Sequence, residues 1–307
     1  MGVSTKYFLE GSIECFKARL VVKGYTQVPG LDYTDTFSPV IKATTVRVVH
    51  SLDVTNKWPL RQLDVKNAFL NGHLNEHVYM EQPPGYIDPR FPNHVYQLQK
   101  ALYGLKQAPH AWFQCLSSFL IQLGFYYSRA DTSLFVFHKH FDIIYLILYV
   151  DDIIITGNNS SLLDSFTCKH NFKFTTKDLG PLNYFLSLEA TTTFDDLFIS
   201  QLKYARDILT SAQLLNNKPI HTPMVVSQHL SIDGHLFSDH RLYRSLVGAL
   251  QYLTIPRPYI SHAINSINQF LHSPTEDHFL VDKRILRYVK DMYTLASPFI
   301  PLLLLVL

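Results

Sequence analysis

Two adjacent carboxylates, Asp151 and Asp152, lie between two strongly apolar runs, residues 143–148 and 153–155. Carboxylates in such surroundings must be hydrated, hydrogen-bonded or bound to a cation, because burial of an unpaired charge is costly. A β-hairpin with the acids at its exposed tip meets this requirement. The most useful chemistry for such a tip is the binding of divalent metal for phosphoryl transfer.

A third carboxylate, Asp64, ends a segment whose alternating pattern over residues 60–65 predicts a strand. An aspartate at a strand end is more often a turn former than a metal ligand. The Asp151–Asp152 pair differs from the Asn-Gly or Asp-Gly that tight hairpins prefer. Residue types alone therefore leave both interpretations of these acids open, turn formation and metal binding.

The elements that must position these acids are strands and helices first, followed by helices. Strands are predicted at residues 16–22, 60–65, 133–138, 143–149 and 153–156, with a further hairpin formed by 184–188 and 197–200. Helices are predicted at residues 44–52, from Ala108-Pro109 to Gly124, from Ser161, and at 201–213, 241–254, 259–271 and 274–291. This order predicts an α+β body with a helical C-terminal region.

Local signals indicate which side one of these helices buries and where two others begin. The helix after Pro109 is expected to bury one stripe of residues, Trp112, Cys115, Phe119 and Leu123. Ser161 with Asp164 is typical of a helix start. Ser273 and Glu276 predict a capping box, with Pro274 at the first helical position.

The composition fits a globular intracellular protein. Apolar residues make up 47% of the 307-residue chain, and the net charge of +2 neither establishes nor excludes a nucleic-acid partner. The cysteines Cys15, Cys115 and Cys168 are widely spaced, so neither a disulfide framework nor a zinc site is predicted. The apolar segment 296–307 is shorter than the ~20 residues that a membrane span needs, so no membrane partner is expected.

From about Gly11 to about Lys290 the chain resembles the reverse transcriptases of copia-type long-terminal-repeat retrotransposons. Seven blocks carry the resemblance: KARLVVKGYTQVPGLDYTDTFSPV (17–40), QLDVKNAFLNG (62–72), VYMEQPPGY (78–86), LYGLKQAPHAWF (102–113), YVDDIIITG (149–157), KDLGPLNYFLSLE (177–189) and KRILRYVK (283–290). Blocks of this length in this order are highly specific to the family.

The resemblance implies a right-hand polymerase fold, in which an antiparallel palm sheet carries the metals. The fingers would come from residues 14–60 and 78–110, and the palm from 61–77 and 110–190. A mostly helical thumb and connection would occupy residues 191–292. Residues 1–13 would be a divergent N-terminal start, and 293–307 an aberrant apolar tail.

By the same resemblance, Asp64 and Asp151 would chelate two Mg²⁺ ions, for which Mn²⁺ could substitute, and Asp152 would complete the acidic cluster. One ion would lower the pKa of the primer 3′-hydroxyl. The other would hold the triphosphate and neutralise the leaving pyrophosphate, at the ~4 Å separation of two-metal sites. Three like charges in close contact would repel without a cation, which favours a metal in the working state.

The resemblance also assigns nucleotide and primer contacts. Arg19 and Lys17 would reach the triphosphate, and Phe69 would exclude a ribose 2′-hydroxyl. The nucleotide-binding set is Lys17, Arg19, Phe69, Gly104, Lys106 and Gln107. The primer and template set is Tyr149, Val150, Phe185, Leu186 and Glu189. Each of these residues also has a purely structural interpretation, as an edge-strand position or as part of the core.

The partners implied are an RNA/DNA template–primer duplex and dNTPs, within a cytoplasmic virus-like particle. The full polyprotein of the family also contains ribonuclease H and integrase modules, which are not recognisable in this sequence. The three acids favour the first hypothesis, an active RNA-directed DNA polymerase domain.

The second hypothesis is a truncated relic without activity. It rests on departures from the family pattern, among them His73, His110 and Ser187, and on the apolar end of the chain. A metal-dependent nuclease or phosphatase would also use an acidic cluster. That third class is disfavoured because nothing in it requires Phe69 or the blocks assigned to the fingers.

Overall fold

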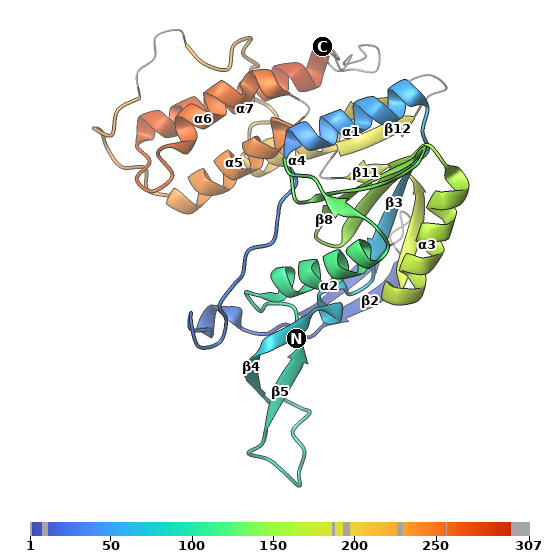
Figure 1. The fold of residues 1–307 in the computed structure, drawn as a ribbon. Helices are drawn as coiled ribbons and strands as arrows, with labels where there is room; N and C mark the ends of the chain where they lie inside the picture. The colour runs from blue at the N-terminus through green and yellow to red at the C-terminus, as the bar shows by residue number, and fades with distance from the viewer. Residues whose placement is uncertain are drawn as a thin grey trace. The chain divides into compact units, whose positions relative to one another are not determined.

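The computed structural model describes residues 2–7, 12–185, 188–192, 197–225, 230–255 and 257–295 (Figure 1). The chain divides into two compact units, Met1–Pro181 and Leu182–Leu307. It is a mixed α/β structure with an antiparallel sheet, which confirms the predicted α+β class at that level.

A six-stranded sheet with strand order β10-β3-β9-β8-β7-β6 forms the centre of the first unit. Its strands are β3 (Leu60–Val65), β6 (Tyr126–Tyr127), β7 (Leu134–Lys139), β8 (Asp142–Tyr149), β9 (Asp152–Gly157) and β10 (Thr176–Pro181). Every neighbouring pair is antiparallel. The predicted strands at 60–65, 133–138, 143–149 and 153–156 are confirmed to within two residues. Strand β10 was not predicted, yet it and β9 hold β3 between them.

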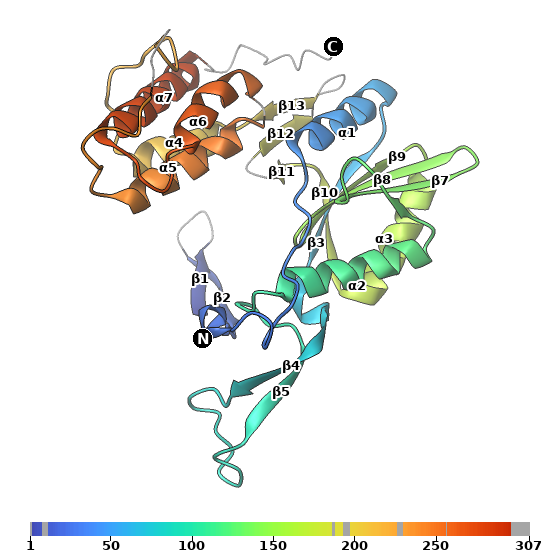
Figure 2. The ribbon, with the colours of Figure 1, turned by 60° about the vertical axis from the view of Figure 1, so that its left-hand side comes forward.

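One face of this sheet is covered by the helices α2 (Ala108–Gln122) and α3 (Ser160–Phe174) (Figure 2). Leu63, Leu148 and Ile153 lie on that face and join the side chains of both helices in one buried core. Burying each such side chain contributes about 1.5–3 kcal/mol. Because side chains alternate along a strand, the neighbours of these residues, Asp64 and Asp152 among them, belong to the opposite face.

The helix α1 (Ala43–Asn56) lies on the other side of the sheet from α2 and α3 (Figures 1 and 2). It confirms the helix predicted at 44–52 and is longer at both ends. Its N-cap residue, Lys42, has no side-chain acceptor. The buried carboxylate of Asp131 serves the start of this helix instead. It accepts hydrogen bonds from the Lys42 backbone amide at 2.9 Å and from the Thr45 hydroxyl at 2.6 Å.

Three local predictions about the helices were wrong in detail. Cys115 of the predicted α2 stripe is only half-buried; the fully buried stripe is Ala108, Trp112, Leu116 and Leu120. The sheet covers that row of side chains, and Phe119 turns to the aromatic ring of Phe174 at 5.1 Å. Helix α3 is capped by the Asn159 side chain, which accepts from the Leu162 amide, and not by Ser161.

The third correction concerns α7 (Glu276–Leu295), which begins two residues after Pro274, so the Ser273–Glu276 capping box does not form. Instead the Thr275 amide donates to Nδ1 of His278 at 2.9 Å. His278 therefore takes the part that Glu or Gln plays in a capping box.

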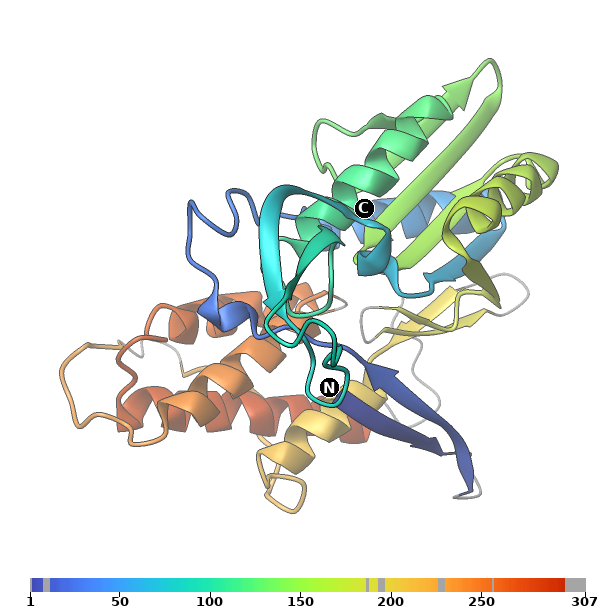
Figure 3. The ribbon, with the colours of Figure 1, turned by 90° about the horizontal axis from the view of Figure 1, so that it is seen from below.

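Two hairpins complete the first unit. Strands β4 (His73–Glu81) and β5 (Val95–Lys100) pair across a long, proline-rich connection. Strands β1 (Gly2–Tyr7) and β2 (Ile13–Arg19) form a separate two-stranded sheet (Figure 3). Strand β2 ends at Arg19, three residues before the end predicted from the sequence.

The second unit begins with β11 (Tyr184–Phe185), β12 (Leu188–Thr192) and β13 (Leu197–Ser200), which pair in that order. The hairpin predicted from 184–188 and 197–200 is therefore wrong, because residues 188–192 form a middle strand. Four α-helices follow within the described residues, confirming the helical C-terminal region: α4 (Leu202–Ser211), α5 (His240–Leu253), α6 (Ser261–Asn268) and α7. They share one core around Tyr243 and Leu250 (Figure 3, yellow to red). None of the described helices is long and apolar enough to cross a membrane.

Candidate active site

The strand register brings the three acids together at one end of the sheet. Asp64 of β3 is the direct partner of Asp152 in β9, and Tyr149 of β8 is the partner of Asp152 on its other side. Directly opposite residues of antiparallel strands place their side chains on the same face, with Cβ atoms about 5 Å apart. The register thus sets Asp64 beside a residue far along the chain.

The loop between β8 and β9 contains only Val150 and Asp151. The predicted hairpin is confirmed, but the expectation that both acids occupy its exposed tip was wrong. Asp152 opens β9, and both acids are half-buried. Because the turn takes Val150 and Asp151 as its two central residues, the second acid becomes part of the sheet ladder.

The turn is strained and held at both of its carbonyls. Val150 has φ 56°, and a β-branched residue at positive φ is an outlier. The indole Nε1 of Trp112 donates to the Val150 carbonyl at 2.6 Å, and the Val65 amide donates to the Asp151 carbonyl at 3.0 Å. Strained conformations persist when the surrounding structure fixes them in this way, and they cluster at functional sites.

The electrostatics of the turn disfavour charge on Asp152. Burial, together with the nearby carboxylates of Asp151 and Asp64, raises the pKa of this carboxyl from 3.8 to about 6. A hydrogen bond from the buried Gln62 side chain opposes the shift. Asp152 therefore lies close enough to both of the other carboxylates to be repelled by them.

The donor chemistry of this cluster suits a hard divalent cation, because Mg²⁺ binds carboxylate oxygens together with water. In the part of the chain that the structure describes, however, no group of three His, Cys, Asp or Glu side chains has the geometry to hold a metal ion. The residues thus fit the cation by type, and the assignment of metal ligands remains a prediction.

Two residues of the predicted nucleotide-binding set meet through a tyrosine that the sequence did not single out. The Arg19 guanidinium lies 5.2 Å from the ring centroid of Tyr103, and the Tyr103 and Phe69 rings meet at 5.1 Å in an edge-on contact. The backbone of Lys17 pairs with Ser4, and its side chain lies outside the described ones. The only sequence signal for Tyr103 was its place inside the 102–113 block.

The polar side chains of the 104–107 loop contact the protein itself. The amide of Gln107 is buried, accepts from Gln27 at 3.0 Å and donates to the Asp32 carbonyl at 2.9 Å. Lys106 Nζ lies 3.2 Å from both the Gln27 carbonyl and the Tyr33 hydroxyl. These contacts fix the loop against residues 24–33, and nucleotide binding by Lys106 and Gln107 remains a prediction.

Gly104 lies where two backbone segments touch. Its φ is +94°, and a Cβ there would sit 2.1 Å from the Val22 carbonyl oxygen. A Cβ on Gly24 would lie 1.8 Å from the Gly104 oxygen. Both glycines are thus required by this close approach, which gives Gly104 a structural role in addition to its predicted nucleotide contact.

Replacing Gly104 with alanine is therefore expected to lower the free energy of unfolding by about 2–4 kcal/mol, since backbone strain and a steric clash add. Gly85→Ala is the matched control, because Gly85 also has positive φ, +85°, but has nothing within 4 Å of its added Cβ. Urea denaturation measures both variants. Equal losses in the two would show that the close approach contributes nothing.

Of the predicted primer-contacting residues, Tyr149 and Val150 lie at the acidic turn of the first unit, and the other three belong to the second unit. Phe185 of β11 is buried and pairs with Leu188, and the Glu189 carboxylate accepts from the Ser200 hydroxyl at 2.9 Å. Leu186 and Ser187 lie outside the described residues. The primer role of this segment therefore stays a prediction.

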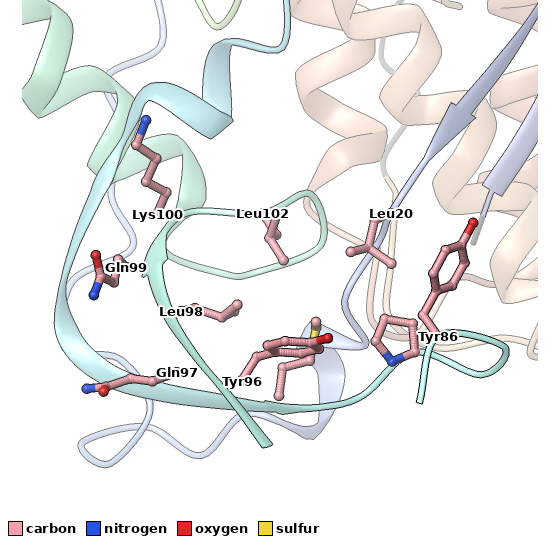
Figure 4. Close-up of a pocket in the computed structure, with 10 residues that line it drawn as sticks. Leu20, Tyr86, Tyr96, Gln97, Leu98, Gln99, Lys100 and Leu102 are labelled. Atoms are coloured by element: carbon pink, nitrogen blue, oxygen red, sulfur yellow. The ribbon is translucent and has the colours of Figure 1, made fainter. Parts of the chain in front are cut away.

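A pocket of about 640 Å³ opens between the β4–β5 hairpin and the chain at Leu20 (Figure 4). Leu20, Tyr96, Leu98 and Leu102 line it with apolar surface, and Gln97 and Gln99 of β5 also belong to the lining (Figure 4). Lys100 is the charged residue of the lining, which contains no acid. No local sequence pattern indicates this pocket, because it joins segments that are distant along the chain.

Comparison with known proteins identifies relatives of this site and its scaffold. The chain is 50% identical over 285 residues to the retrovirus-related Pol polyprotein from transposon RE1 of Arabidopsis thaliana, covering 92% of this chain and 19% of that protein. It is 36% identical over 296 residues to the Pol polyprotein from transposon TNT 1-94 of Nicotiana tabacum, covering 90% and 22%. The chain thus spans about a fifth of the length of these relatives.

A shorter relative, the putative transposon Ty5-1 protein of Saccharomyces cerevisiae, is 30% identical over 239 residues, which is 76% of each chain. No solved structure matches the chain. Residues 9–226, more than half of the sequence, match the reverse transcriptase (RNA-dependent DNA polymerase) family. The chain therefore belongs to this family, in the copia-type group of retrotransposon Pol polyproteins.

Proposed function

We propose that this chain is an RNA-directed DNA polymerase domain that transfers a nucleotide from a dNTP to a primer 3′-hydroxyl. The observation that carries the proposal is the β3–β9 register, which sets Asp64 opposite Asp152 and beside the turn containing Asp151. The six-stranded sheet would be the palm. Residues 14–60 and 78–110 would form the fingers, and residues from about 191 the thumb.

Asp64, Asp151 and Asp152 would hold the divalent cations, with Mg²⁺ as the first candidate and Mn²⁺ as a substitute. When bound, such ions lower the pKa of the attacking hydroxyl and neutralise charge on the leaving pyrophosphate. The raised pKa of Asp152 supports this assignment, because a cation would relieve the repulsion that the three carboxylates otherwise feel.

The Arg19–Tyr103–Phe69 contacts support a nucleotide site on the same unit. Arg19 has a planar guanidinium that suits two-pronged contact with phosphate oxygens. Tyr103 holds the Phe69 ring edge-on, and Phe69 also packs against two buried clusters. A ring fixed in this way would form a rigid wall against a ribose 2′-hydroxyl.

Phe69→Val is accordingly expected to raise the preference for rNTPs over dNTPs by about tenfold or more, the scale on which a lost steric contact changes selectivity. The measurement is the ratio of kcat/KM values for single-nucleotide incorporation. Phe113→Val is the control, since Phe113 packs against the same palm core and its ring contact is with Phe135. An unchanged ratio in Phe69→Val would remove the gate role.

The nucleic-acid partner is supported by the pocket beside Leu20. Its aromatic and apolar walls with one lysine and no acid suit stacked bases and phosphate. In the complete polyprotein, ribonuclease H and integrase modules would act with this domain in a cytoplasmic virus-like particle.

Primer extension by the purified chain tests the polymerase proposal. With Mg²⁺ and dNTPs we expect extension of a DNA primer on both RNA and DNA templates, each stopped by omission of the metal. Cooperative unfolding in urea would show that the purified chain is folded. If a folded chain extends neither template, the polymerase proposal fails and the relic hypothesis stands.

A further inference from the structure

The Trp112 side chain joins helix α2 to the acidic turn. It is 1% exposed, and its Nε1–H donates to the Val150 carbonyl at 2.6 Å. The ring also meets Phe174, at the end of α3, edge-on at 5.2 Å. The indole is therefore fixed by both helices that cover the sheet, while its one polar atom reaches the residue before Asp151.

The carbonyl that Trp112 contacts belongs to the central peptide of a two-residue hairpin loop. Of the two loop residues, Val150 alone has a positive φ. That distribution of φ matches the type II′ turn, whereas type I′ requires positive φ at both central residues. The two turn types differ by rotation of the peptide between the central residues, so the orientation of the Val150 carbonyl distinguishes them.

Val150 does not favour this conformation by itself. Type II′ turns prefer glycine at the first central position, and valine is among the least suited residues there. Its side chain is 38% exposed, so close packing of the valine does not enforce the positive φ. The hydrogen bond from Trp112 is the contact made directly to the carbonyl of this peptide among the described residues, and it opposes rotation of the peptide.

We propose that Trp112 is a positioning residue that locks the Val150–Asp151 peptide, and thereby fixes where the Asp151 carboxylate points relative to Asp64. Rotation of this peptide would change φ of Asp151 and re-aim its Cα–Cβ bond. This inference rests on the proposed function, because binding of a divalent cation by the acids is the property that the lock would control. A merely structural Trp112 would stabilise the core without affecting that affinity.

The chain contains two tryptophans, so it offers a matched control. Trp58 is half-buried and stacks on Tyr145 at 6.2 Å, on strand β8 four residues before Tyr149 at its end. Trp58→Phe and Trp112→Phe make the same chemical change and keep an aromatic ring. Only Trp112→Phe removes the donor to Val150.

The test is titration of the full chain with Mn²⁺, following free Mn²⁺ by its electron paramagnetic resonance, together with urea unfolding of each variant. Trp112→Phe is expected to raise the Mn²⁺ dissociation constant about tenfold, equivalent to about 1.4 kcal/mol, which is the size of one hydrogen bond. Trp58→Phe is expected to change the dissociation constant less than about twofold. Equal dissociation constants in Trp112→Phe and the unchanged chain would overturn the inference.

A rescue variant separates positioning from packing. Glycine favours the type II′ turn without help, so Val150→Gly in the Trp112→Phe chain is expected to recover most of the lost Mn²⁺ affinity. Absence of recovery would contradict the inference. The double variant also serves if Trp112→Phe alone does not fold, because the inference then requires Val150→Gly to restore folding.

The proposed function has its own failure signal in the same experiment. If the unchanged chain and Asp151→Asn bind Mn²⁺ equally, the acids are not the metal site and the proposed function fails. If Asp151→Asn binds weakly while Trp112→Phe binds like the unchanged chain, the metal site stands and only the role of Trp112 is refuted.

Discussion

Asp151→Asn is expected to reduce primer extension by about 10³-fold or more, because removing a metal ligand forfeits several kcal/mol of transition-state stabilisation. Asparagine keeps the size of the side chain and removes its charge. Single-turnover extension of a labelled primer at saturating dNTP measures the effect. Retained activity would exclude Asp151 as a ligand of the catalytic metal.

Asp142→Asn is the matched control for this variant. Asp142 begins β8, at the other end of the strand from the turn, and its carboxylate accepts from the Asn159 side chain at 2.9 Å. We expect near-normal extension from it, so a general effect of losing one carboxylate would be recognised.

Asp151→Asn should leave the fold intact. The backbone contact at this position, from the Val65 amide to the Asp151 carbonyl, does not involve the side chain. The Asp151 carboxylate also raises the pKa of Asp152, so its removal relieves repulsion in the folded state. A variant that loses activity without losing stability at neutral pH is the signature expected of a residue kept for function.

The second large effect concerns Asp282, buried in the helical unit. It is 0% exposed, and both carboxylate oxygens lack a hydrogen-bond partner among the described residues. Burial raises the pKa of its carboxyl from 3.8 to about 7, partly offset by Lys283. The pKa of this carboxyl is higher in the folded state than in the unfolded state. The contribution of the neutral carboxyl to the free energy of unfolding is therefore complete below pH 3.8 and is lost as the pH rises through about 7.

Asp282→Asn should remove this pH dependence, because asparagine remains neutral at every pH. At pH 8 we expect the variant to be more stable than the unchanged chain by about 2–4 kcal/mol, while near pH 4 the difference should be small. Urea unfolding of both chains at a series of pH values measures the difference. Asp277→Asn, at an exposed position of the same helix, should show no such trend. Parallel profiles for Asp282→Asn and the unchanged chain would show that Asp282 does not titrate in this range.

The strands around the site were predictable where apolar residues alternate or run together. The segments that became β3, β8 and β9 carry such patterns and were placed to within one residue. Strand β10 was missed because Lys177, Asp178, Gly180 and Pro181 oppose strand formation locally. It exists because it pairs with the free edge of β3, which is a long-range effect that no local pattern records.

The candidate site was predictable only in part, for a related reason. The acids could be chosen from the sequence blocks, but the turn could not, because Val150 is an unfavourable residue at positive φ. Trp112 was predicted as a core residue, which is confirmed. Its hydrogen bond to the turn between β8 and β9 was not foreseeable. The assignment of Gln107 to the nucleotide stays a prediction, and the bonds of its amide to Gln27 and Asp32 were not foreseeable from the sequence.

The central claim is that Asp64 on β3 and the acids of the β8–β9 turn form one metal site. Replacing Mg²⁺ with Fe²⁺ in the presence of ascorbate and peroxide generates hydroxyl radicals that cut the backbone beside a bound ion. We expect cuts near Asp64 and near Asp151, both suppressed by excess Mg²⁺ and both absent in Asp151→Asn. Cuts at only one of the two segments, or at neither in a folded chain, would contradict the claim.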